Sequence, residues 1–116
     1  MKYTDKQRIE HIIILTDKLL QYLEENNITR EMVSGVETIR WTITTPLYNI
    51  GEQVYNLSDE FKKKNNDIPW AKISGMRHRL VHDYEDTNWD IICDVIFDIL
   101  PDFKKQMTII GSQINK

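Results

Sequence analysis

Apolar residues recur along this chain at the three- and four-residue spacing of an α-helix, and the alternation typical of a strand is nearly absent. The first such segment predicts a helix from about Thr4 to Asn26, because Thr4 can cap it and Gln7 follows at the capping-box position. After Thr29, a second stripe keeps the helical spacing over about seven turns. Its members are Val36, Ile39, Ile43, Leu47, Ile50, Val54, Leu57 and Phe61.

The second half of the chain predicts two further helices. One starts near Pro69 and ends between His82 and Asp86, where the sequence DYEDTN is rich in turn-forming and capping residues. Either Thr87 or Asn88 caps the next helix. The apolar stripe of that helix consists of Ile92, Ile96, Ile99, Phe103, Met107, Ile110 and Ile114.

Two prolines lie inside the predicted helices. Pro46 and Pro101 each lack a backbone N–H and clash with the preceding turn, so each predicts a kink or an interruption. The connections are short, so neighbouring helices are expected to be mostly antiparallel. The pattern therefore predicts an all-α bundle of four to five helices in a single domain, residues 1–116.

Composition narrows the class of protein. With 116 residues, 41% apolar and 28% charged, the chain is suited to one globular domain that would gain from pairing with a second copy. No run of about 18 apolar residues is present, so we expect no membrane span. The single cysteine, Cys93, lies in an apolar segment and cannot form an internal disulfide. We therefore expect the Cys93 thiol to be buried. We also expect the protein to work in the cytoplasm, where thiols stay reduced.

Charge is distributed unevenly. The net charge is −3, which argues against a generic nucleic-acid binder. Residues 61–84, however, hold six basic and two acidic residues, so this segment carries +4 and the rest of the chain −7. The basic charge is concentrated around the stretch GMRHRLVHDYED, residues 75–86, at the end of the third predicted helix.

Three interpretations of that stretch compete. His78 and His82 have the four-residue spacing of a metal-ligand pair, but no third ligand is obvious. In a structural interpretation, His82 and Asp83 cap the helix and Arg79 pairs with Asp83.

The third interpretation is metal-independent cleavage of a phosphodiester. Histidine exchanges protons near neutral pH, arginine binds phosphate, and tyrosine donates a hydrogen bond or stacks on a base. Arg77, His82 and Tyr84 supply these groups. Arg77 and His82 are about 140° apart on a regular helix, so they converge only if the helix ends near His82 or a second subunit helps. Spacing alone leaves all three interpretations open.

The segment IPWAKISGMRHRLVHDY resembles the signature of HepT-type toxins of the HEPN superfamily (higher eukaryotes and prokaryotes nucleotide-binding). That signature is R-x-x-x-x-H-x-Y, preceded by I-P-W and G-M-R. It is matched by Ile68, Pro69, Trp70, Gly75, Met76, Arg77, His82 and Tyr84. The segments YNIGEQVYNLS and LPDFKKQM resemble the family's I-G-E and L-P segments, so the similarity extends from about Arg40 to Met107.

This resemblance implies a HEPN-like homodimer in which the Arg–His motifs of two chains meet in a cleft. Active relatives are metal-independent RNA endonucleases, the toxins of bacterial toxin–antitoxin modules, and need no cofactor. Arg77 would then hold the scissile phosphate, His82 would be the general acid or base, and Asp83 would orient His82. Tyr84 would be a site component and the target of AMPylation by a minimal nucleotidyltransferase antitoxin. The alternative is a non-catalytic nucleotide- or partner-binding HEPN module associated with a nucleotidyltransferase.

One carboxylate outside the motif is a further candidate. Glu52 lies in the middle of the second predicted helix, and a buried charge there would need a partner. We expect it to pair with Arg77 and to support the site. Trp70 is expected in the core or a dimer interface, with a base-stacking role as the alternative. Tyr48 and Tyr55 are likewise expected in an interface or the core, with a site role for either as the alternative.

Overall fold

The fold was analysed in a computed structural model that describes residues 3–82 and 84–114, with the backbone alone of Tyr84. The described residues form helices joined by short turns, with no strand among them, so the predicted all-α class is confirmed. The elements are α1 (Asp5–Glu25), α2 (Arg30–Gly35), α3 (Glu37–Tyr55), α4 (Asp59–Lys64), α5 (Trp70–His82), η1 (Tyr84–Asp86), α6 (Trp89–Cys93), η2 (Asp94–Ile99) and α7 (Leu100–Ile114).

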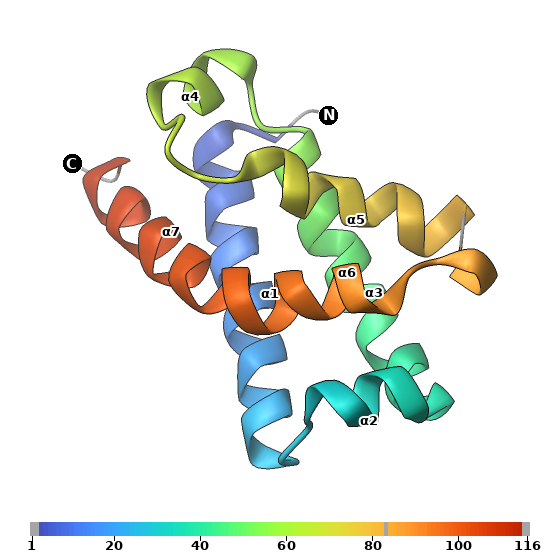
Figure 1. Cartoon of the computed structure of the whole chain (residues 1–116). Coiled ribbons are helices and arrows are strands. Elements are labelled where there is room, and N and C mark those ends of the chain that lie inside the picture. The colour runs from blue at the N-terminus through green and yellow to red at the C-terminus, as the bar shows by residue number, and fades with distance from the viewer. Residues whose placement is uncertain (1–2, 83, 115–116) are drawn as a thin grey trace.

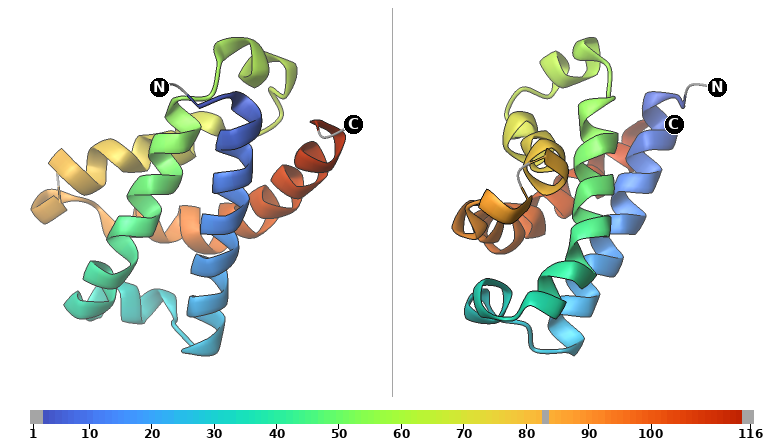
Figure 2. Two further views of the ribbon diagram at one scale, coloured as in Figure 1. Left: turned by 180° about the vertical axis from the view of Figure 1, so that it is seen from behind. Right: turned by 90° about the vertical axis from the view of Figure 1, so that its right-hand side faces the viewer.

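The helices form two layers that cross each other. α1 and α3 run side by side in opposite directions, and α2 links their ends (Figure 1). α5 packs across α3, and the continuous run from α6 through η2 to α7 returns beside α5 and packs on α1 (Figure 2). None of the described helices combines the length and apolar character needed to cross a bilayer. The arrangement leaves the C-terminal end of α5 at an edge of the molecule, as Figure 1 shows.

The first helix has the predicted capping box. The Thr4 hydroxyl accepts from the Gln7 backbone N–H at 3.1 Å, and the Gln7 side chain accepts from the Thr4 N–H at 2.9 Å. Two N–H groups that a helix start leaves without partners are thereby satisfied.

The long second stripe is not one helix, and that prediction is wrong at its C-terminal end. α3 ends at Tyr55, and Ser58 caps the separate helix α4 by accepting from the Phe61 N–H. The Ser58 backbone N–H and hydroxyl both donate to the Asp5 carboxylate of α1, which fixes the turn. Leu57 is nevertheless buried and Phe61 packs on Trp70, so the apolar spacing continues although the helix does not.

The two prolines are accommodated differently. α3 runs through Pro46, so the predicted alternative of a break there is wrong. Pro101 follows the π-helical segment η2, in which the Leu100 N–H donates to the Val95 carbonyl five residues earlier. A proline ring clashes with the carbonyl four residues before it, and the wider π turn gives that ring room.

The core lies between the two layers. Phe103 of α7 is fully buried and meets Trp70 of α5 edge to face, with ring centroids 6.0 Å apart. Trp70 is therefore a core residue, in agreement with one of the two expectations for it. Burying one such aromatic side chain contributes on the order of 2 kcal/mol to stability.

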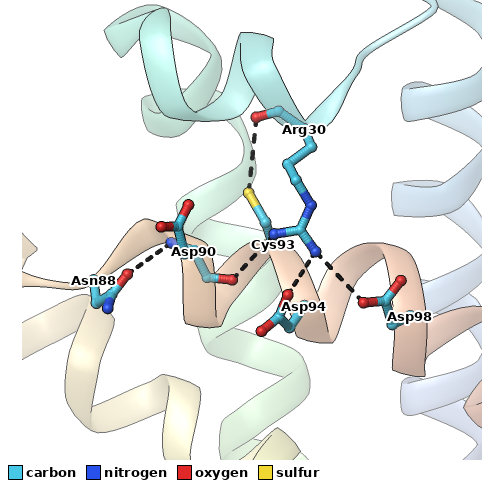
Figure 3. A network of polar contacts seen from close by, with 6 residues as sticks. All are labelled: Arg30, Asn88, Asp90, Cys93, Asp94 and Asp98. Atoms are coloured by element: carbon cyan, nitrogen blue, oxygen red, sulfur yellow. Dashed lines mark hydrogen bonds and ion pairs between the residues drawn. The ribbon is translucent and has the colours of Figure 1, made fainter.

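A polar network ties α2 to the α6–η2 run. Arg30 forms ion pairs with Asp94 and Asp98 and donates to the Asp90 carbonyl (Figure 3). The buried Cys93 thiol lies 3.9 Å from the Arg30 carbonyl, and burial raises the pKa of that thiol. Cys93 is thus a buried hydrophobic side chain, as predicted, with no partner for a disulfide in this chain.

Candidate active site

Helix α5 carries the Arg–His motif. Ile73, Met76 and Leu80 of this helix face the core, and this leaves the motif side chains toward solvent. The Arg77 side chain keeps 31% of its surface exposed, and His82, the last residue of α5, is exposed. The helix therefore presents both groups at the molecular edge rather than in the core.

Gly51 brings α3 unusually close to α5. A Cβ atom built on Gly51 would lie 3.1 Å from the Arg77 backbone nitrogen and 3.2 Å from the Ile73 carbonyl oxygen. Real Cβ atoms rarely approach backbone this closely, so any larger residue would require α3 or α5 to shift by a few tenths of an ångström. The backbone contact places Glu52, the next residue of α3, beside Arg77.

Glu52 and Arg77 form the expected ion pair. Arg77 Nη1 lies 3.6 Å from Glu52 Oε2, and Glu52 Oε1 accepts from the Asn56 side-chain amide at 3.1 Å. The pair is loose and partly exposed, so its contribution to stability is at most about 1 kcal/mol. Among the side chains that the structure describes, Arg77 makes this ion pair and donates no hydrogen bond, although a guanidinium offers five N–H donors.

Tyr55 lies beside the candidate site, against Arg77, which was only the less favoured of its expected places. The Arg77 guanidinium carbon lies 3.5 Å from the centre of its ring, a close cation–π contact. Tyr55 is 53% exposed, so of the two expected places the core is wrong, and a dimer interface stays a prediction. Tyr55 follows Glu52 by three residues, and that spacing on one helix face is the sequence signal that favours its place beside Arg77.

Lys62 joins this group from α4. Its Nζ atom donates to the Tyr55 backbone carbonyl at 3.0 Å and lies 5.9 Å from the centre of the Tyr55 ring. Two cations therefore lie near one exposed aromatic ring. Both of them, Lys62 and Arg77, come from the basic segment, residues 61–84.

The structure does not bring Arg77 and His82 together within one chain. α5 stays helical through His82, so the two side chains leave the axis about 140° apart. The His82 ring instead lies 4.9 Å from that of His78, one turn earlier. Among the described residues no three or more His, Cys, Asp or Glu side chains cluster as metal ligands would.

Two predicted site residues follow α5. Asp83 lies outside the described residues, and so does its expected pairing with Arg79. The backbone of Tyr84 begins the 3-10 helix η1, beyond the end of α5. The Thr87 hydroxyl donates to the Arg79 carbonyl at 2.6 Å and so holds the turn against the end of α5.

The all-α fold and the motif R-x-x-x-x-H-x-Y at the exposed end of α5 define a HEPN-type domain. The chain belongs to the HepT-like family, because the family model described as "Ribonuclease HepT-like" matches residues 8–110. The resemblance seen in the sequence is thereby confirmed.

Relatives from other organisms carry ribonuclease names. A protein named "Putative RNase" from Caldanaerobacter subterraneus subsp. tengcongensis is 30% identical over 113 residues, covering 90% of this chain and 91% of its own. "Probable ribonuclease HepT" of Thermococcus cleftensis is 24% identical over 104 residues, covering 90% and 93%. No solved structure matches the chain.

Proposed function

We propose that this protein is a metal-independent RNA endonuclease that acts in the cytoplasm as the toxin of a toxin–antitoxin module. The observation that carries the proposal is the placement of the Arg77 guanidinium, in a chain that belongs to this ribonuclease family. Glu52 and Tyr55 hold its guanidinium at the molecular edge, and beyond the ion pair with Glu52 it donates no hydrogen bond to a described side chain. Such a group can bind a phosphate whose negative charge grows in the transition state.

His82 supplies the proton transfer. An imidazole takes a proton from a 2′-hydroxyl, or gives one to the leaving oxygen, near neutral pH. The divergence of Arg77 and His82 within one chain favours a site assembled from two chains, with each motif completing the other. We therefore include a homodimer, with its cleft along the motif helices, in the proposal.

The purified chain is expected to cleave single-stranded RNA in the presence of excess EDTA, because the proposed proton transfer uses imidazole and no metal-bound water. Gel analysis of a labelled RNA measures this. The same oligonucleotide with 2′-deoxyribose throughout is the control and should stay intact, because it lacks the attacking hydroxyl. Cleavage that EDTA abolishes, or RNA left intact by the purified protein, would contradict the proposal.

Tyr84 is the proposed target of a nucleotidyltransferase antitoxin. It lies directly beyond the motif helix, at the start of η1, where an added AMP group would crowd the site. Intact-mass measurement after co-expression with the transferase should show added AMP units, lost in Tyr84→Phe and retained in the matched variant Tyr55→Phe. An unchanged mass beside an active transferase would mean that inhibition works in another way, such as by covering the site.

Charge favours a second candidate, a non-catalytic HEPN module that binds a nucleotide or a nucleotidyltransferase. The chain outside residues 61–84 carries −7 and repels RNA over most of the surface. A purified dimer that binds the transferase and leaves several RNAs uncut would support this candidate over the nuclease.

A further inference from the structure

Tyr55 and Lys62 extend the candidate site from Arg77 to helix α4. We infer that they form a subsite for one unpaired nucleotide of single-stranded RNA, with its base stacked on the Tyr55 ring and a neighbouring phosphate on Lys62. The inference rests on the proposed function, because it takes the scissile phosphate to lie at Arg77. The subsite would bind the nucleotide that lies next to that phosphate in the substrate.

The Tyr55 ring is the first part of the argument. It lies at the last residue of α3, where its side chain keeps 53% of its surface exposed although the Arg77 guanidinium lies against it at 3.5 Å. The contact holds the ring against Arg77, and the exposed fraction shows that about half of the residue is still open to solvent. A base next to a phosphate bound at Arg77 can therefore stack without displacing the guanidinium.

Lys62 is the second part. Its bond to the Tyr55 carbonyl uses one of three ammonium donors and holds the charge beside the ring, 5.9 Å from its centre. Lys64, by comparison, pairs with Glu60 at 3.3 Å, and Lys63 is exposed on the same short helix. Lys62 is thus the lysine of α4 whose ammonium is placed at the aromatic ring.

The chemistry favours a single strand over a duplex. Cations that alternate with an exposed aromatic ring are typical of single-strand sites, where each phosphate meets a positive charge and each free base a π-face. In a paired helix the bases are already stacked and cannot reach Tyr55. The same unpaired strand would present a flexible 2′-hydroxyl for attack at the scissile position.

The test measures binding separately from cleavage. The full chain carrying His82→Ala, which should not cut, is titrated against a fluorescent single-stranded RNA and the same RNA as a duplex. Tyr55→Leu is expected to weaken single-strand binding about tenfold. Lys62→Gln should lower the slope of log Kd against log salt by about 0.7, the effect of one lost phosphate contact.

Matched controls occupy the same two helices. Trp41→Leu removes an equally exposed aromatic from the other end of α3, and Lys63→Gln removes the same charge one residue from Lys62. Both should leave single-strand affinity within about twofold of the parent. Tyr55→Phe should also retain it, because stacking requires the ring and not the hydroxyl.

The outcomes separate the two proposals. Loss of single-strand affinity in Tyr55→Leu, with Trp41→Leu unaffected, supports the subsite. If Tyr55→Leu binds like the parent while Arg77→Ala has lost affinity, the subsite is overturned and the nuclease proposal stands. If neither Arg77→Ala nor Tyr55→Leu changes the Kd, RNA does not bind here, and both are overturned.

Discussion

Replacing His82 by alanine is expected to lower RNA cleavage by about 10²- to 10⁴-fold, the usual contribution of a positioned general acid or base. The fold should survive, because His82 is exposed at the last residue of α5 and contributes nothing to the core. Initial cleavage rates and the growth of cells expressing the variant measure the effect. An unchanged melting temperature would show that the loss is chemical.

His78→Ala is the matched control for this prediction. His78 lies one turn earlier on the same helix, is exposed, and has its ring 4.9 Å from that of His82. It should keep most of the activity, because the proposed site uses His82 alone. A His82→Ala protein that cleaves RNA at the parent rate would remove this residue from catalysis.

Mixing two inactive variants tests the shared site. If Arg77 and His82 of different chains act together, Arg77→Ala and His82→Ala proteins that exchange subunits should recover part of the activity. The recovery follows from geometry, because a mixed dimer holds one site with both groups intact. Two active sites each contained within one chain would show no recovery.

The helices were predictable where local chemistry decides them. The capping box at Thr4 and Gln7 depends on residues three apart and can be seen without a structure. The end of α3 was not predictable in this way, because Leu57 and Phe61 are buried whether or not the helix continues. Periodicity reports burial, whereas the break at Ser58 depends on Asp5, a partner 53 residues away.

The same distinction holds for the candidate site. The Glu52–Arg77 ion pair was expected because a buried carboxylate in the middle of a helix needs a partner, and Arg77 of the motif was the obvious candidate. The contact of Tyr55 with Arg77 depends on how closely α3 approaches α5, which the spacing of apolar residues does not specify. That approach is set by Gly51, whose significance appears only when the neighbouring backbone is seen.

Gly51→Leu is therefore expected to damage stability and site together. The new side chain would meet the backbone of α5 at Ile73 and Arg77, which cannot rotate away as a flexible side chain could. Overpacking of this kind costs about 1–3 kcal/mol or more, against a helix-propensity gain of about 1 kcal/mol. Because small domains are stable by only about 5–15 kcal/mol, urea unfolding should show a clear loss.

Gly75→Leu separates this effect from the mere loss of a glycine. A Cβ atom on Gly75, in the middle of α5, meets nothing within 4 Å, so this variant should be as stable as the parent or more so. The two substitutions are chemically identical, and only Gly51→Leu forces α3 and α5 apart. Because that separation also pulls Arg77 from Glu52 and Tyr55, the folded Gly51→Leu protein should cleave RNA slowly. Equal stability and activity in the two variants would show that the α3–α5 contact does not position the site.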